Sequence, residues 1–188
     1  MSRNKFPPRP RHDPDSGPVY LYGLHTVRAA LDNPRREKRR LLATPNALGR
    51  LRESGEIGRI AHAETTPREL DRLLGADAVH QGVALEVEPV SRFGLDDVAP
   101  LDLVVILDHV TDPHNVGAIL RTACAFGANA VITTARYAPR ETGVMAKAAS
   151  GALDLVPLIE VRNLGDAIET VKRRGMTILG LDSEAAEP

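Results

Sequence analysis

Residues 101–127 read LDLVVILDHVTDPHNVGAILRTACAFG, and this stretch decides the fold. It opens with a continuous apolar run, Leu103 to Leu107, which has the length and Val/Ile content of a strand buried on both faces. Asp112-Pro113 then supplies a helix cap followed by a proline suited to the first helical turn. Apolar residues next recur at helical spacing, at Val116, Ile119, Leu120 and Ala123. The pattern predicts a buried strand followed by a helix that packs one stripe against a sheet.

The opposite side of this predicted helix carries small residues and one cation. Gly117, Ala118, Arg121 and Ala125 lie there, where a solvated face would normally carry several Lys or Glu. The small residues indicate that something approaches this face closely, with Arg121 reaching toward it.

The rest of the chain continues the alternation of strands and helices. After residue 127 we expect strands at 130–134, 153–158 and 177–181, and helices at 143–149 and 164–174. Before residue 101 we expect strands at 19–22, 39–43, 58–63 and 83–87, with helices from Gly23 to Asn33, at 47–52 and from Thr66 to Leu74. The second half therefore predicts a parallel sheet with right-handed crossovers, and the first half a smaller α/β module.

Composition divides the chain into four segments. Residues 1–18 are basic and proline-rich, which predicts a flexible arm, and 19–88 form the first α/β module. Residues 89–100 mix Pro, Ser, Gly and acidic side chains and are the expected linker, and 101–188 form the second domain.

Charge is distributed unevenly along the chain. Residues 1–60 hold 13 Lys and Arg against 6 Asp and Glu, a balance of +7, whereas the whole chain has a net charge of −1. This asymmetry favours a polyanionic partner for the first half, and an ordinary solvated surface explains it equally well.

Several classes of protein lack support. No apolar run reaches the roughly 20 residues of a membrane span, and the lone Cys124, on the apolar side of a helix, reads as a core residue of a cytoplasmic protein. Neither a G-x-G-x-x-G fingerprint nor a P-loop is present. The six histidines lack metal-ligand spacing, so we expect no metal site, and the few aromatic residues do not predict a base-stacking sheet.

The stretch after Asp112 resembles the first motif of the SpoU/TrmH branch of the SPOUT RNA 2′-O-methyltransferases. The matching residues are Asp112, Pro113, Asn115, Gly117, Arg121, Thr122, Ala123, Phe126 and Gly127. The resemblance extends to 147–152 and 156–157, and back to 22–27 and 80–84, so that it covers residues 19–182. Within the family, the chain resembles the bacterial 23S rRNA guanosine methyltransferases of the RlmB type.

The resemblance implies methyl transfer from S-adenosylmethionine to a ribose 2′-hydroxyl, with Asn115 and Arg121 in the active site. Arginine resists deprotonation, so we expect Arg121 to orient a phosphate and stabilise the developing 2′-oxyanion rather than act as a base. Asn115 would hold Arg121 or the ribose. The alternative is structural: Asn115 caps the helix, and Arg121 pairs with an acid such as Asp108.

The resemblance also assigns the first domain to RNA. A structured RNA, in this family 23S rRNA, suits it better than a stacked single strand. The expected phosphate contacts are Arg28, Arg35, Arg36, Lys38, Arg39 and Arg40. Gly180 and Leu181 are the one loop expected near S-adenosylmethionine.

The second and third SpoU motifs are absent before Pro188. In the family they close a C-terminal trefoil knot, hold most of the cofactor site and form much of the homodimer contact. The expected fold class is thus α/β: a small N-terminal substrate-binding domain plus an incomplete parallel-sheet SPOUT-type domain. We expect a truncated form of a longer methyltransferase, for which dimerisation is not expected of this chain alone. A non-catalytic RNA-binding protein is the main alternative. A small-molecule α/β enzyme has only the strand–helix alternation behind it.

Overall fold

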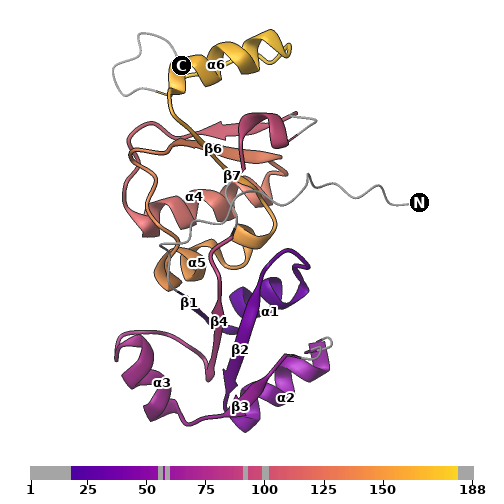
Figure 1. Cartoon of the computed structure of the whole chain (residues 1–188), viewed down its shortest axis with the longest axis vertical. Coiled ribbons are helices and arrows are strands. Elements are labelled where there is room, and N and C mark those ends of the chain that lie inside the picture. The colour runs from indigo at the N-terminus through magenta and orange to yellow at the C-terminus, as the bar shows by residue number, and fades with distance from the viewer. Residues whose placement is uncertain (1–17, 55–56, 58–59, 91–92, 99–101, 182–188) are drawn as a thin grey trace, which may run out of the picture.

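A computed structural model describes residues 18–54, 57, 60–90, 93–98 and 102–181. Figure 1 shows two sheets arranged one above the other along the long axis, with helices α4 and α5 between them. In chain order the elements are β1 (Val19–Tyr22), α1 (Leu24–Asp32), β2 (Lys38–Ala43), α2 (Pro45–Ser54), β3 (His62–Glu64), α3 (Pro67–Leu74), β4 (Val83–Val87), η1 (Leu95–Asp97), β5 (Val104–Ile106), α4 (Pro113–Ala125), β6 (Ala130–Thr134), α5 (Gly143–Ala149), η2 (Ala152–Asp154), β7 (Leu158–Val161) and α6 (Leu164–Arg173).

The first sheet has the strand order β1-β4-β2-β3. Strand β4 runs antiparallel to β1 and β2, whereas β2 and β3 are parallel. Leu21, Leu41 and Leu85 point from its strands into one core and are fully buried. Helices α1 and α2 lie on one side of this sheet and α3 on the other (Figure 1). The predicted start of α3 is confirmed, because Thr66 and Glu69 form a reciprocal capping box.

The second sheet contains β5, β6 and β7 in that order. Its strands are all parallel, as the sequence predicts. The central strand β6 is buried along its whole length. Strand β5 is only half-buried, so the prediction that it is covered on both faces is wrong. Its position at the edge of the described sheet explains the difference.

Two sequence predictions about the second half of the chain need correction. Residues 153–158 do not form a strand: they contain part of η2 and a turn, and strand β7 begins only at Leu158. A short apolar run has the same appearance in a strand and in a buried turn. Residues 177–181 form no strand, since none of them pairs with a described strand. Within the expected linker, Phe93 bridges to Ile159, and both Phe93 and Val98 are buried.

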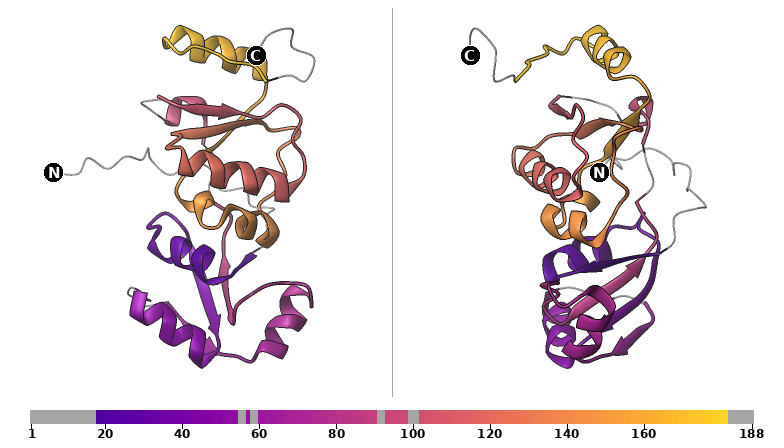
Figure 2. Two further views of the ribbon diagram at one scale, coloured as in Figure 1. Left: turned by 180° about the vertical axis from the view of Figure 1, so that it is seen from behind. Right: turned by 90° about the vertical axis from the view of Figure 1, so that its left-hand side faces the viewer.

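One hydrophobic core runs through both halves of the molecule. It joins Leu21 and Val27 of the first half to Val116, Leu120 and Met145 of the second. A smaller core covers the opposite face of the second sheet, where Ile132 and Ile159 pack with α6. Figure 2 shows α5 against the first sheet and α6 at the far end of the molecule. The continuous core fixes the two sheets relative to each other.

Gly117 explains the small-residue face of α4. It is buried, and an added Cβ would overlap the Met145 carbonyl oxygen and lie 2.8 Å from the Ala148 methyl carbon. The close approach predicted from the sequence is therefore confirmed at Gly117. The group that approaches there is helix α5 of the same chain.

We predict that Gly117→Ala destabilises the protein by about 1–3 kcal/mol, because the backbone of α5 must shift to make room. The matched control is Gly49→Ala in α2, where an added Cβ meets nothing within 4 Å. That change should stabilise the protein by up to about 1 kcal/mol through helix propensity. Urea unfolding of the two variants measures both effects. Equal effects of the same sign would contradict the packing account.

Residues 1–17 of the predicted arm lie outside the described residues. Among the helices that the structure describes, none is long and apolar enough to cross a membrane.

Candidate functional site

Both predicted catalytic residues lie on helix α4. Asn115 lies in its first turn and Arg121 two turns later, and both side chains are exposed. Within the described part of the chain, neither side chain has a hydrogen bond or ion pair of its own. Both are therefore available to a ligand.

The structural alternative for these two residues does not match the contacts. Asp112, not Asn115, caps α4: its Oδ1 accepts a hydrogen bond from the His114 N–H at 3.0 Å. Asp108, the acid expected to pair with Arg121, instead lies 2.5 Å from Nδ1 of His109. Among the described residues, neither Asn115 nor Arg121 therefore makes a side-chain hydrogen bond or ion pair that stabilises the fold.

Helix α4 is a rigid support for these side chains. Val116, Leu120 and Ala123 are buried on its inner side, and Gly117 contacts α5. A side chain on such a helix is displaced less than one on a loop. The spacing of Asn115 and Arg121 is thus fixed by the core.

Arg36 is buried and belongs to an ion-pair network. Its side chain is 0% exposed and forms a two-point contact with Asp154, with Nε–Oδ1 at 2.9 Å and Nη2–Oδ2 at 3.0 Å. Its Nη1 lies 2.5 Å from Glu141 Oε1 and 3.2 Å from the Glu88 carbonyl oxygen. Burial alone would lower the pKa of Arg36, but the charges of Glu141 and Asp154 outweigh it and raise the pKa. Arg36 therefore joins the two halves of the chain and is not a surface phosphate contact, which corrects its place in the predicted set.

The other predicted RNA contacts differ in exposure. Arg28, Arg39 and Arg40 are about half exposed and face Asp32, Glu88 and Glu86, respectively. Lys38 donates to the Asn33 carbonyl oxygen at 2.7 Å, and burial lowers the pKa of its amine. Arg35 lies over the Phe93 ring, 5.5 Å from its centroid, and burial lowers its pKa. Three exposed arginines on α1 and β2 thus remain as phosphate-contact candidates.

The residues predicted near the cofactor do not form a pocket. Leu181 is fully exposed, Leu179 is 86% exposed, and nothing lies within 4 Å of a Cβ added at Gly180. Among the described residues, Gly180 and Leu181 are exposed, and their place near S-adenosylmethionine stays a prediction.

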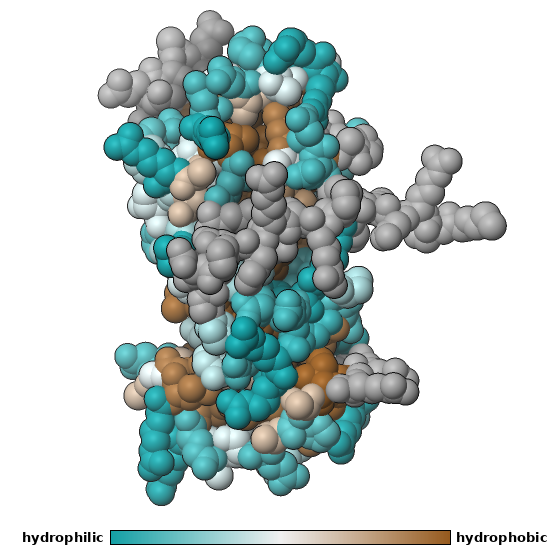
Figure 3. All heavy atoms as spheres, viewed as in Figure 1, coloured by the Kyte–Doolittle hydropathy of each residue, from teal (hydrophilic) through white to brown (hydrophobic). Residues whose placement is uncertain are grey.

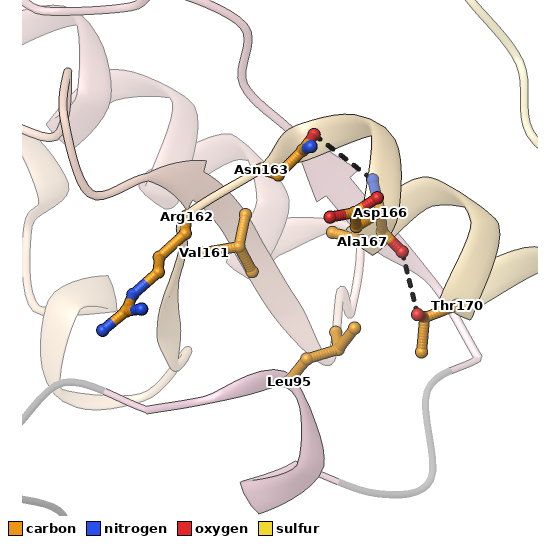
Figure 4. Close-up of a pocket in the computed structure, with 7 residues that line it drawn as sticks. All are labelled: Leu95, Val161, Arg162, Asn163, Asp166, Ala167 and Thr170. Atoms are coloured by element: carbon orange, nitrogen blue, oxygen red, sulfur yellow. Dashed lines mark hydrogen bonds between the residues drawn. The ribbon is translucent and has the colours of Figure 1, made fainter.

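A hollow of about 290 Å³ lies between α6 and the second sheet, where Figure 3 shows apolar surface. Figure 4 shows its lining: Leu95, Val161, Arg162, Asn163, Asp166, Ala167 and Thr170. Its polar groups already serve helix α6, because Asn163 Oδ1 accepts from the Gly165 and Asp166 N–H groups and the Thr170 hydroxyl donates to the Asp166 carbonyl. This lining offers few free groups for a reaction.

The structure also brings together side chains that the sequence did not single out. His109 follows β5 and Tyr137 follows β6, and their ring centroids are 4.1 Å apart. The Arg136 guanidinium carbon is 5.4 Å from the Tyr137 centroid. These residues come together because β5 and β6 are parallel neighbours in the sheet. His109 and Tyr137 are 28 positions apart in the sequence, which gives no sign of the contact. Among the described residues, no group of three or more His, Cys, Asp or Glu is arranged to hold a metal ion.

The fold is α/β with a parallel three-stranded second sheet, and comparison with known proteins identifies the family of this chain. The model of the SpoU rRNA Methylase family matches residues 102–188. The model named RNA 2′-O ribose methyltransferase substrate binding matches residues 20–93. The chain belongs to the SpoU rRNA methylase family.

Its relatives include named enzymes. The chain is 36% identical over 178 residues to the 23S rRNA (guanosine-2′-O-)-methyltransferase RlmB of Pseudomonas putida, covering 89% of this chain and 71% of the relative. It is 35% identical to the RlmB of Vibrio vulnificus, covering 88% and 71%. The SpoU methyltransferase AviRb of Streptomyces viridochromogenes, solved with AdoMet, has the same fold, with a TM-score of 0.66 and 23% identity over 85% of this chain and 61% of that one. This chain thus spans about three fifths of that solved structure.

Proposed function

We propose that the protein is an rRNA ribose 2′-O-methyltransferase that uses S-adenosylmethionine and modifies a guanosine of 23S rRNA. The observation that carries the proposal is the pair Asn115 and Arg121, exposed and without a partner among the described residues, on a rigid helix of a SpoU-family chain. The substrate class follows from relatives at 35–36% identity that are named for this reaction.

Asn115 and Arg121 have separate tasks in this proposal. The guanidinium of Arg121 presents a planar fork of donors that suits a phosphate or a developing 2′-oxyanion. Its charge is permanent, so it stabilises the oxyanion without removing the proton itself. The Asn115 amide both donates and accepts hydrogen bonds, which suits it to hold the ribose. Because α4 is packed on its inner side, the two groups hold the target nucleotide in one orientation.

We propose residues 19–88 as the RNA-binding domain, 89–100 as the connection and 101–188 as the catalytic part. The complete fold would act as a cytoplasmic homodimer, as the family resemblance implies. Size-exclusion chromatography with light scattering measures the assembly directly.

Exposed arginines of the first domain would contact phosphates. The side chains of Arg28 and Arg40 are 54% and 51% exposed, and their nearest acids lie at 4.0 and 3.4 Å. We predict that Arg28→Gln and Arg40→Gln each weaken RNA binding for all sequences alike and lower the salt slope by about 1. Binding titrations over a series of salt concentrations test this, with Arg173→Gln on α6 as the control. An unchanged slope would remove these residues from the RNA surface.

Methylation in vitro tests the proposed function. The natural protein, expressed from its complete gene, is incubated with S-adenosylmethionine labelled in its methyl group and with 23S rRNA transcript. Nucleoside analysis should find the label in 2′-O-methylguanosine. RNA binding without any methyl transfer would favour the non-catalytic RNA-binding alternative, and label on a base would contradict the ribose assignment.

A further inference from the structure

Three planar side chains lie together at the carboxyl ends of adjacent strands. The β5–β6 register pairs Ile106 with Ile132, so the segments that follow the two strands leave the sheet at the same edge. The imidazole of His109 and the ring of Tyr137 meet there, 4.1 Å apart and tilted by 41°. Ligands of open parallel α/β sheets bind at this edge.

The conformation of His109 is unusual. Its φ of 56° lies in the left-handed region, which costs an ordinary residue about 1–2 kcal/mol relative to glycine. The contact between its Nδ1 and Asp108 Oδ1 at 2.5 Å fixes the ring. A strained position that holds an aromatic ring in one orientation points to a task for that ring.

The cluster is open to solvent. The His109 side chain is 62% exposed and that of Asp108 69%, and Arg136 is also exposed. The stack therefore adds little to the hydrophobic core. Aromatic rings and guanidinium planes at a surface are the groups on which proteins stack the unpaired bases of RNA.

Position supports the same reading. His109 lies three residues before Asp112, the cap of α4, and the same helix carries Asn115 in its first turn. Arg136 and Arg140 are exposed in the segment that contains Tyr137, where they add positive charge for neighbouring phosphates.

We propose that His109, Tyr137 and Arg136 form a platform on which one unpaired base of the RNA substrate stacks. The inference deepens the proposed function and rests on it. This platform consists of two rings and one guanidinium, so it requires neither a base-stacking sheet nor further aromatic residues.

RNA binding by three variants of the complete protein tests the platform. Tyr137→Ala removes the phenol ring, and Tyr137→Phe keeps the stacking surface. His109→Gly removes the imidazole and also relieves the positive φ, so this variant should be at least as heat-stable as the unsubstituted protein. His62→Ala, at an exposed histidine of β3 at the other end of the molecule, is the control.

Affinity is measured by fluorescence anisotropy with an RNA stem-loop and with its fully paired counterpart. Stacking of one base corresponds to about a five- to 150-fold change in affinity. We expect losses in this range for Tyr137→Ala and His109→Gly with the stem-loop only, and little change for Tyr137→Phe and His62→Ala. An abasic site at the stacked nucleotide should weaken binding by the unsubstituted protein and leave binding by Tyr137→Ala unchanged.

Two results would overturn the platform. Equal losses with both RNAs would assign the residues to phosphate contact, and unchanged affinity of a folded His109→Gly protein would show that its ring binds no base. If the unsubstituted protein binds neither RNA, the proposed function fails, and the platform fails with it.

Discussion

Arg36→Met should destabilise the protein by about 3–5 kcal/mol, the largest stability effect that we expect of any single substitution. The substitution removes the cation between Asp154 and Glu141, whose side chains are 1% and 8% exposed. Two buried carboxylates would then lie together without the cation that both of them contact. Because one core joins the two sheets, the loss should be seen in a single urea transition with a lower midpoint and an unchanged slope.

The same variant should acquire a distinct pH dependence. Burial raises the pKa of Glu141, and without Arg36 only the hydrogen bond from the Val90 N–H opposes this effect. A carboxyl whose pKa is raised in the folded state favours folding below its unfolded pKa, and that contribution is lost as the pH rises through the folded value. Arg36→Met should therefore lose less stability relative to the unsubstituted protein at pH 5 than at pH 8. The control is Arg28→Met. The Arg28 side chain is exposed and lies 4.0 Å from Asp32, so its replacement should lower the free energy of unfolding by less than about 1 kcal/mol. If Arg36→Met also lowered the free energy of unfolding by less than about 1 kcal/mol, the ion-pair network of Arg36 would not stabilise the fold as we propose.

Arg121→Ala should lower the rate of methyl transfer at saturating RNA by about 100- to 1,000-fold, the usual cost of removing one donor to a developing oxyanion. The fold should be unaffected, because Arg121 is exposed and lacks a partner among the described residues. Arg121→Lys keeps the charge and loses the planar fork of donors, so its activity should lie between that of Arg121→Ala and that of the unsubstituted protein.

Steady-state kinetics separate the two tasks that Arg121 can have. A contact made only in the transition state lowers kcat, whereas uniform binding of phosphate raises KM alone. Arg173→Ala, at an exposed arginine on α6, is the matched control. A kcat for Arg121→Ala within twofold of the unsubstituted value would exclude Arg121 from the chemical step.

The sequence predicted elements well where local signals determine them. The Asp112-Pro113 cap placed the start of α4, and the Thr66-Pro67 pair placed that of α3. The parallel direction of β5, β6 and β7 followed from the alternation of strands with helices. These signals act over a few residues, so no partner needs to be known.

Long-range contacts explain what the sequence could not predict. Arg36 reads as part of the same basic run as Arg39 and Arg40, and only the folded chain brings it to Asp154, which lies 118 residues away. Gly117 indicated a close approach without naming α5 as the neighbour. His109 met Tyr137 for the same reason, since pairing of β5 with β6 decides which loops are adjacent.

Mapping 2′-O-methyl groups on 23S rRNA from cells that lack the gene tests the proposed methyltransferase function. We expect one guanosine to lose its ribose methyl group. The unsubstituted gene should restore it, and a gene that carries Arg121→Ala should not. An unchanged methylation map in the deletion strain, or full restoration by the Arg121→Ala gene, would contradict the account.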